Sequence, residues 1–170
     1  METQVIIVDK DNNIIGHKSR SELTSEDIYR VSAVRITDEN GKILLGQRAL
    51  TKKKNPWKRW SSVAWTLELG ETYESNIIKE IEEEIGIKMT LDQLQAQPIE
   101  YREWSWWKNK YFGQWFVWIY DWEKSLLKKQ DEEVEALKRF TKEELQQELE
   151  NTPEKFLTSV SIKLEEFNTL

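Results

Sequence analysis

The stretch that decides the fold is "GETYESNIIKEIEEEIG", residues 70–86, which places six glutamates among seventeen residues. Its isoleucines recur at the spacing of one helix face, at Ile77, Ile78, Ile81 and Ile85. Gly86 follows, and glycine is the residue that most often ends a helix in the left-handed conformation. The pattern therefore predicts a helix over residues 72–85 with one apolar stripe.

Strand-like segments lie on both sides of this helix. Residues 4–16 form apolar runs around a polar turn, and residues 29–49 repeat that scheme, so each segment predicts a hairpin. Aromatic-rich runs at residues 98–107 and 111–122, and a shorter run at residues 134–140, predict further strands.

Two helices are predicted near the C-terminal end, within residues 141–168. Thr141 with Glu144 forms a capping box, and Thr152 with Pro153 opens a second amphipathic segment. The order of strands, helix, strands and helices is typical of an α+β domain, with helices packed on a mixed or mostly antiparallel sheet. Since no linker rich in Pro, Gly or Ser divides residues 1–170, we expect a single domain.

The composition argues against several classes of function. A net charge of -6 at pH 7 disfavours general binding to nucleic-acid phosphates or to anionic lipid. The absence of cysteine removes disulfides, zinc–thiolate sites and cysteine nucleophiles, and it suits the reducing cytoplasm. No apolar run approaches the roughly 18 residues of a membrane-spanning helix, so we expect no membrane contact.

The glutamates of the predicted helix allow two interpretations. Glu80, Glu83 and Glu84 lie within about one turn, and we expect their carboxylates to converge on a face turned away from the isoleucines. Such a face can simply be solvated. Alternatively it binds a hard divalent cation, because Mg²⁺ prefers carboxylate oxygens and keeps waters and phosphates as further ligands. A cation would also remove the repulsion between the like charges.

The spacing of the residues favours the cation site. Seven of the nine defined positions of the pattern G-x5-E-x7-R-E-U-x-E-E-x-G-U, where U is aliphatic, are matched by Glu71, Glu80, Ile81, Glu83, Glu84, Gly86 and Ile87. Residues 65–87 therefore resemble the signature segment of the Nudix hydrolases. The resemblance implies a Nudix-type α/β/α sandwich, in which a mixed sheet is flanked by helices.

Two positions depart from the signature. Its first glycine falls at Trp65, a bulky residue with a restricted φ, and its arginine falls at Lys79, which keeps the charge but lacks a bidentate fork. The carbonyl before that glycine often binds metal in the family, and Ala64 can still offer one. These departures leave open a catalytically weakened Nudix-fold module that binds a nucleotide or a partner.

The resemblance extends over residues 4–145 to a subgroup that includes isopentenyl-diphosphate isomerase and related hydrolases. Isomerisation in that subgroup relies on a cysteine at the position of Ala64, and a histidine follows at the position of Thr66. This chain contains no cysteine. We therefore expect hydrolysis and not isomerisation.

The resemblance implies a Mg²⁺-dependent hydrolase, with Mn²⁺ as an alternative metal, that cleaves a diphosphate linkage in a nucleoside diphosphate derivative. The implied metal ligands are Glu80, Glu83, Glu84 and the carbonyl of Ala64. The implied catalytic residues are Glu83 and Glu80, with Glu71 and Lys79 orienting the cluster, and Glu83 is the best candidate for handling the attacking water.

A further glutamate from a late loop or strand often joins this site in the family. Spacing alone does not choose among the candidates Glu132, Glu133 and Glu135.

The substrate side is predicted from one basic and two aromatic residues. Arg48 ends the second hairpin, where the family often directs a basic side chain at phosphate, although it could equally be a surface arginine. Trp60 and Trp65 bracket the approach to the signature, and each could stack on a nucleobase or fill the core. The expected partner is a small nucleotide or diphosphate, and an exposed aromatic patch could instead form a homodimer.

Overall fold

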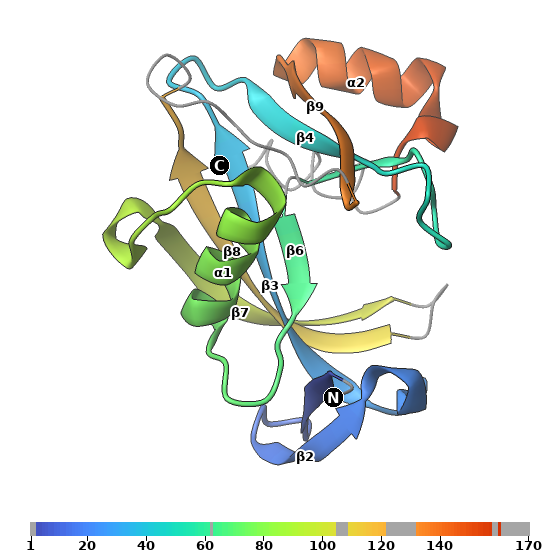
Figure 1. Cartoon of the computed structure of the whole chain (residues 1–170), viewed down its shortest axis with the longest axis vertical. Coiled ribbons are helices and arrows are strands. Elements are labelled where there is room, and N and C mark those ends of the chain that lie inside the picture. The colour runs from blue at the N-terminus through green and yellow to red at the C-terminus, as the bar shows by residue number, and fades with distance from the viewer. Residues whose placement is uncertain (1–2, 62, 105–108, 122–131, 158–159, 161–170) are drawn as a thin grey trace.

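The central strand β3 (Ile28–Thr37) organises the molecule (Figure 1). The computed structural model describes residues 3–61, 63–104, 109–121, 132–157 and 160. The other strands are β1 (Gln4–Val8), β2 (Ile14–Ser19), β4 (Ile43–Arg48), β5 (Arg59–Ser61), β6 (Val63–Thr66), β7 (Gln95–Trp104), β8 (Asn109–Ile119) and β9 (Val134–Phe140). The helices are α1 (Tyr73–Ile85) and α2 (Lys142–Asn151), with short 3-10 turns at Arg20–Glu22, Leu91–Gln93 and Pro153–Lys155.

The strands form one mixed sheet with two branches. In the first branch β3 runs parallel to β8 along its whole length and antiparallel to β6, while β7 pairs with β8 at the edge. In the second branch β4 pairs with β5 and β9. Figure 1 shows α1 lying across the first branch and α2 lying beside the second. The predicted α+β class with a mixed sheet is confirmed.

The first predicted hairpin is confirmed, and the second is confirmed only at its turn. β1 and β2 pair antiparallel, with the Asp9 carboxylate accepting backbone hydrogen bonds in the turn. Asp38 and Gly41 make the second turn, where the Gly41 N–H donates to the Asp38 carbonyl at 3.0 Å. Beyond it β3 and β4 pair only between Thr37 and Ile43, because β4 turns away to pair with β9.

The predicted strand at residues 134–140 and the helix capped by Thr141 are both confirmed. The last predicted helix begins differently, since Pro153–Lys155 forms a 3-10 turn. Most of its remaining length, including residues 161–168, lies outside the described residues. Within the part of the chain that the structure describes, every helix is too short or too polar to cross a membrane.

The helix α1 is fixed at both ends and along its apolar face. The Thr72 hydroxyl accepts a hydrogen bond from the Ser75 N–H, and Gly86 ends the helix with φ 72°. Between them Ile77, Ile81 and Ile85 are fully buried in the main core with side chains from β3 and β8. The helix predicted over residues 72–85 is therefore confirmed, and its packing fixes the position of every glutamate on it.

Candidate active site

The buried side of α1 is half apolar and half polar. Asn76, Glu80 and Glu84 follow one another at four-residue spacing beside the isoleucines, and Glu80 and Glu84 are each only 3% exposed. The expectation that the glutamates face away from the isoleucines is therefore wrong for Glu80 and Glu84. Glu83, by contrast, is exposed. The buried arc is wider than the apolar stripe, since Asn76 contacts Ser32 of β3, and the charges of Arg48 and Glu133 in the second sheet branch act on Glu84.

Glu80 is held in a weakly solvated environment. Burial raises the pKa of its carboxyl to about 7, the charge of Lys79 opposes that rise, and the nearby charge of Glu83 adds to it. A carboxyl group with this pKa is only partly ionised at neutral pH without a further cation.

The pKa of Glu84 is raised further than that of Glu80. Burial raises the pKa of its carboxyl to about 8, with the charges of Glu80 and Glu133 adding to the rise and those of Arg48 and Lys52 opposing it. Its Oε2 atom is buried and makes no hydrogen bond to any described residue. A buried oxygen without a partner is costly, so this atom marks a place suited to an additional cation.

The donor set fits a hard divalent cation in part. Glu80 and Glu84 present carboxylate oxygens on one edge of α1, and the unpartnered Oε2 of Glu84 is the oxygen that a metal would satisfy. Within the described residues no three acidic or histidine side chains are gathered closely enough to hold a metal by themselves. A metal here would therefore complete its shell with water or phosphate oxygens, as Mg²⁺ commonly does.

Among the late glutamates, the structure singles out Glu133. It lies just before β9, forms an ion pair with Lys52, and is the one whose charge acts on Glu84. Glu132 and Glu135 are exposed. The ion pair brings a carboxylate and an ammonium group from outside α1 to the polar edge of the helix.

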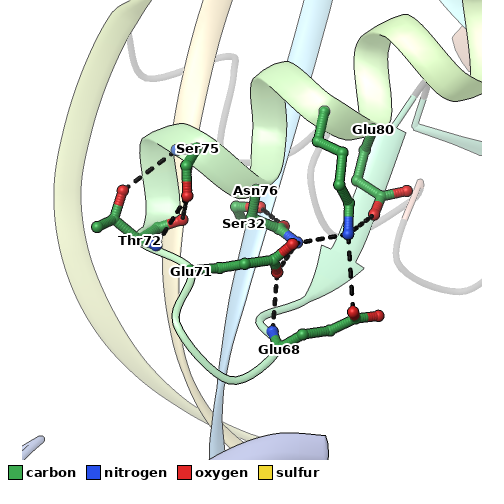
Figure 2. A network of polar contacts seen from close by, with 8 residues as sticks. Ser32, Glu68, Glu71, Thr72, Ser75, Asn76 and Glu80 are labelled. Carbon is green, nitrogen blue, oxygen red and sulfur yellow. Dashed lines mark hydrogen bonds and ion pairs between the residues drawn. The ribbon is translucent and has the colours of Figure 1, made fainter. Parts of the chain in front are cut away.

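The ammonium group of Lys79 forms ion pairs with three carboxylates, those of Glu68, Glu71 and Glu80, and Figure 2 labels these three glutamates. Its Nζ is 2.6 Å from Glu71 Oε1, 3.4 Å from Glu80 Oε1 and 3.8 Å from Glu68 Oε2. Partial burial acts to lower the pKa of Lys79, but the hydrogen bond to Glu71 and the three negative charges hold it above its ordinary value. The lysine thus remains a cation that ties the loop before α1 to Glu80.

Glu71 is held by donors from three directions. Its Oε1 accepts from Lys79, while its Oε2 accepts from the Asn76 side chain at 2.7 Å and from the Glu68 N–H at 2.8 Å. Burial acts to raise the pKa of Glu71, but these hydrogen bonds hold it below the ordinary value. Asn76 in turn accepts a hydrogen bond from the hydroxyl of Ser32 on β3.

Arg48 and Trp60 form the basic side of the site. The Arg48 guanidinium lies 5.7 Å from the centroid of the Trp60 ring, and its Nε donates to the Lys54 carbonyl at 3.2 Å. Trp60 is only 7% exposed, and the Cβ of any residue replacing Gly46 would lie 3.1 Å from its ring. Most of the ring surface is thus covered by protein, so Trp60 supports Arg48 more than it offers a free stacking surface.

Ala64 and Trp65 lie on β6, opposite Ala33 and Ser32 of β3. Trp65 belongs to a regular strand, so a tryptophan at this position needs no positive φ. Its ring lies under the guanidinium of Arg20, 5.0 Å from the centroid. Of the predicted site residues, Trp65 is thus placed beside the N-terminal segment, whereas the charged residues gather around Glu80 and Glu84.

Three site residues were not predicted from the sequence: Ser32, Glu68 and Asn76. Asn76 carried a usable signal, because it stands in helical register with Glu80 and Glu84 on the side that is buried. Ser32 and Glu68 carried none, since each comes near the helix only through sheet pairing or through the loop before it.

A cleft of about 470 Å³ lies elsewhere, at the start of β3. It is lined by Lys10, Glu26, Ile28, Tyr101, Glu103 and Lys110. None of the predicted site residues contributes to it, so the cleft is separate from the acidic edge of α1.

The chain is similar to one protein family and to individual known proteins. Residues 28–160 match the family described as NUDIX domain. An uncharacterised Nudix hydrolase from Yersinia pestis is 33% identical over 84 residues, which are 49% of this chain and 46% of that protein. A prenyl-diphosphate phosphatase from Methanosarcina mazei is 36% identical over 92 residues, which are 54% of each chain. The chain spans about half the length of these curated relatives.

A solved structure covers nearly the whole chain. The crystal structure of a Deinococcus radiodurans protein matches with a TM-score of 0.76 at 18% identity, over 96% of this chain and 98% of that one. At this identity the likeness shows a shared fold. It confirms the sandwich expected from the sequence.

Proposed function

Because the chain belongs to the Nudix family, we propose that it is a Mg²⁺-dependent hydrolase that cleaves a diphosphate linkage in a nucleoside diphosphate derivative. One observation carries the proposal. Glu80 and Glu84 are buried together on the edge of α1, and Glu84 Oε2 has no hydrogen-bond partner among the described residues. Two ionisable carboxyl groups with raised pKa values in one place are typical of a functional site and costly in a merely structural one.

The chemistry divides between the bound cation and the protein. When bound, a divalent cation neutralises phosphate oxygens and lowers the pKa of the attacking water. Glu80 and Glu84 would hold it, with Ala64 offering a backbone carbonyl. Glu83 is exposed beside them and would accept the proton of the water.

Positive charge for the phosphates of the substrate would come from outside the helix. Arg48 and Lys52 both act electrostatically on Glu84, so a phosphate near that carboxylate would also lie near them. Glu133 is the alternative general base, because it is paired with Lys52 and is the late glutamate whose charge acts on Glu84.

A prenyl diphosphate is the second candidate substrate. The support is the name of the Methanosarcina mazei relative, a prenyl-diphosphate phosphatase that matches over 54% of each chain. Either substrate presents the same diphosphate to the acidic edge of α1. Isomerisation of a prenyl diphosphate is not proposed, because the chain has no cysteine.

A catalytically weakened binding module is the competing function. This function is suggested by Trp65 and Lys79, which depart from the Nudix signature. Lys79 nevertheless keeps ion pairs to three carboxylates, and Trp65 fits a regular strand without a positive φ. These contacts favour the hydrolase.

The test is a turnover assay of the purified chain on nucleoside diphosphate sugars, dinucleoside polyphosphates and prenyl diphosphates, with Mg²⁺, Mn²⁺ or EDTA. We expect release of phosphate or nucleoside monophosphate from at least one substrate in Mg²⁺, and loss of it in EDTA and in Glu83→Gln. A binding module would instead show a rise in melting temperature with a ligand and no turnover on any compound.

A further inference from the structure

A chain of polar contacts, buried at Ser32, Asn76 and Glu80 and partly exposed at Glu71 and Lys79, connects the central strand to the acidic helix. It comprises Ser32, Asn76, Glu71, Lys79 and Glu80, and is called the Asn76 network below (Figure 2). We propose that Asn76, anchored by Ser32, is a positioning residue of the active site that holds Glu71 in place for Lys79, and that Asn76 and Lys79 together supply what a single arginine at position 79 would supply. The proposal deepens the proposed function and rests on it.

The first step is a count of donors at Glu71. Its two oxygens accept three hydrogen bonds, of which Lys79 provides only the one to Oε1 at 2.6 Å. The bonds to Oε2 come from the Asn76 amide at 2.7 Å and from the Glu68 N–H at 2.8 Å. Both lone-pair positions of Oε2 are therefore filled, and Asn76 is the side chain that fixes this second oxygen.

The second step is a count of acceptors around Lys79. An ammonium group has three N–H bonds, and carboxylates of Glu71, Glu80 and Glu68 lie within 3.8 Å of Nζ. Only the contact to Glu71 Oε1 at 2.6 Å is a short hydrogen bond, and the contacts to Glu80 at 3.4 Å and Glu68 at 3.8 Å are ion pairs, so the second oxygen of Glu71 receives no N–H from Lys79. A lysine at this position therefore depends on another residue to hold Glu71, and Asn76 is that residue.

The third step concerns what holds Asn76. It is fully buried, and its Oδ1 accepts from the hydroxyl of Ser32, which is also fully buried on β3. This bond leaves only the Nδ2 end of the amide to donate to Glu71. The loop residue Glu71, which follows Gly70 with φ 87°, is thus positioned from the central strand as well as by the Glu68 N–H of its own loop.

The consequence is a specific coupling between positions 76 and 79. Arginine offers a planar fork with parallel N–H groups that can reach both oxygens of a carboxylate. In the natural chain the Asn76 amide already donates to Glu71 Oε2, so the second N–H of an arginine at position 79 would find that oxygen occupied. Asn76→Ala removes the amide donor from that oxygen, so the second N–H of an arginine at position 79 can donate a hydrogen bond to it.

The experiment is a four-member cycle of the natural chain, Asn76→Ala, Lys79→Arg and the double variant. Mn²⁺ dissociation constants are measured on the purified proteins, together with kcat and KM on the best diphosphate substrate. Since loss of an outer partner of a metal site commonly costs about 10-fold to 100-fold, we expect Asn76→Ala to weaken Mn²⁺ binding and lower kcat by about 10-fold, with KM changed by less than about 3-fold. In the Lys79→Arg background the same Asn76→Ala change should cost less than about 3-fold, so the double variant should bind Mn²⁺ and turn over nearly as well as Lys79→Arg alone.

Ser75→Ala is the matched control, because Ser75 is the neighbouring residue and, within the part of the chain that the structure describes, its hydroxyl bonds with Thr72 at the helix cap. It should leave Mn²⁺ affinity unchanged. If Asn76→Ala does not fold, Ser32→Ala tests the same network, with a smaller loss in the same direction. The proposal is overturned if Asn76→Ala binds Mn²⁺ as tightly as the natural chain, or if the double variant is no better than Asn76→Ala.

The outcome can be separated from that of the proposed function. If the natural chain turns over no diphosphate, the proposed function fails, and the Mn²⁺ affinities still decide the role of Asn76. If the natural chain binds no Mn²⁺, melting temperatures decide: Lys79→Arg must stabilise the chain more with Ala at position 76 than with Asn, and additive shifts would overturn the network.

Discussion

At the scale of single residues, the most informative feature is the free-energy cost of burying the Glu84 carboxylate. Its carboxylate is 3% exposed, and its Oε2 atom has no hydrogen-bond partner among the described residues. The first turn of the same helix shows what a residue selected for stability does, since Thr72 and Ser75 satisfy each other's polar groups. The burial of Glu84 therefore lowers the stability of the fold while it holds a carboxylate in a fixed place. This combination is expected of a ligand-binding carboxylate.

The substitution Glu84→Gln should separate stability from function. Above pH 8, where the Glu84 carboxyl of pKa about 8 is mostly ionised, removing the buried charge should raise the melting temperature of the metal-free protein by about 4 °C, because 1 kcal/mol moves it by about 2–4 °C in a chain of this size. Diphosphate hydrolysis should fall to background. Calorimetry in EDTA and the turnover assay measure the two effects.

Glu82→Gln is the control for that change. Glu82 lies on the same helix, is about half exposed, and among the described residues its carboxylate pairs with the exposed Lys88 at 3.4 Å. The same loss of charge should leave both melting temperature and activity nearly unchanged. A fall in the metal-free stability of Glu84→Gln would contradict our assignment of its carboxylate as a strained ligand.

The residues of the acidic helix could be predicted because their spacing is local. Glu71, Glu80, Glu83 and Glu84 follow from the signature pattern alone. What spacing did not reveal is the difference in burial between Glu83 and Glu84, because that depends on a second sheet branch whose position the helix sequence does not encode. The choice of Glu133 among three late glutamates depends on the same long-range packing.

At the scale of elements, the end of α1 could be predicted from one glycine. Gly86 has φ 72°, a left-handed conformation that costs other residues about 1–2 kcal/mol. Gly86→Ala should therefore lower the free energy of unfolding by about 1–2 kcal/mol, measured by urea denaturation. Because Gly86 is exposed, crowding should add nothing to this cost.

The matched control is Gly16→Ala, on strand β2. Gly16 has an ordinary negative φ and open space around its Cβ position, so an alanine there should be neutral or slightly stabilising. Equal destabilisation by the two alanines would show that loss of glycine itself, and not the left-handed conformation, sets the cost.

Strand pairing was less predictable than the helix. The turn at Asp38–Gly41 predicted a hairpin, yet β3 pairs mainly with β8 and β6, while β4 pairs with β9 and β5. Partners so far apart in the chain leave no local pattern. The sequence therefore predicts which segments are strands more reliably than which strands are neighbours.

At the scale of the whole molecule, the site joins the two branches of the sheet. The helix α1 is packed on the first branch, whereas Arg48 ends β4 and Glu133 precedes β9 in the second. The charges acting on Glu84 thus come from α1 itself, through Glu80, and from the second branch and its loops, through Arg48, Lys52 and Glu133. Any ligand that neutralises Glu80 and Glu84 should stabilise the molecule as a unit.

This coupling predicts a pH dependence of stability in the metal-free protein. The pKa of Glu80 is raised from 4.5 to about 7 and that of Glu84 from 4.5 to about 8. Between pH 5 and pH 8 the folded chain therefore holds protons that the unfolded chain has released, so stability falls as pH rises. We expect the melting temperature in EDTA to drop by at least about 5 °C across this range.

Mg²⁺ should reverse this loss, and it should do so most strongly where both carboxyl groups would otherwise be ionised and unpaired. At pH 8 a saturating concentration should raise the melting temperature more than at pH 5, where protons compete for the same oxygens. In Glu84→Gln the slope of stability with pH and the gain from Mg²⁺ should both shrink, since only Glu80 still titrates. A metal-free melting temperature that rises from pH 5 to pH 8, or an equal Mg²⁺ effect at both values, would show that these two carboxylates are neither strained nor metal-binding.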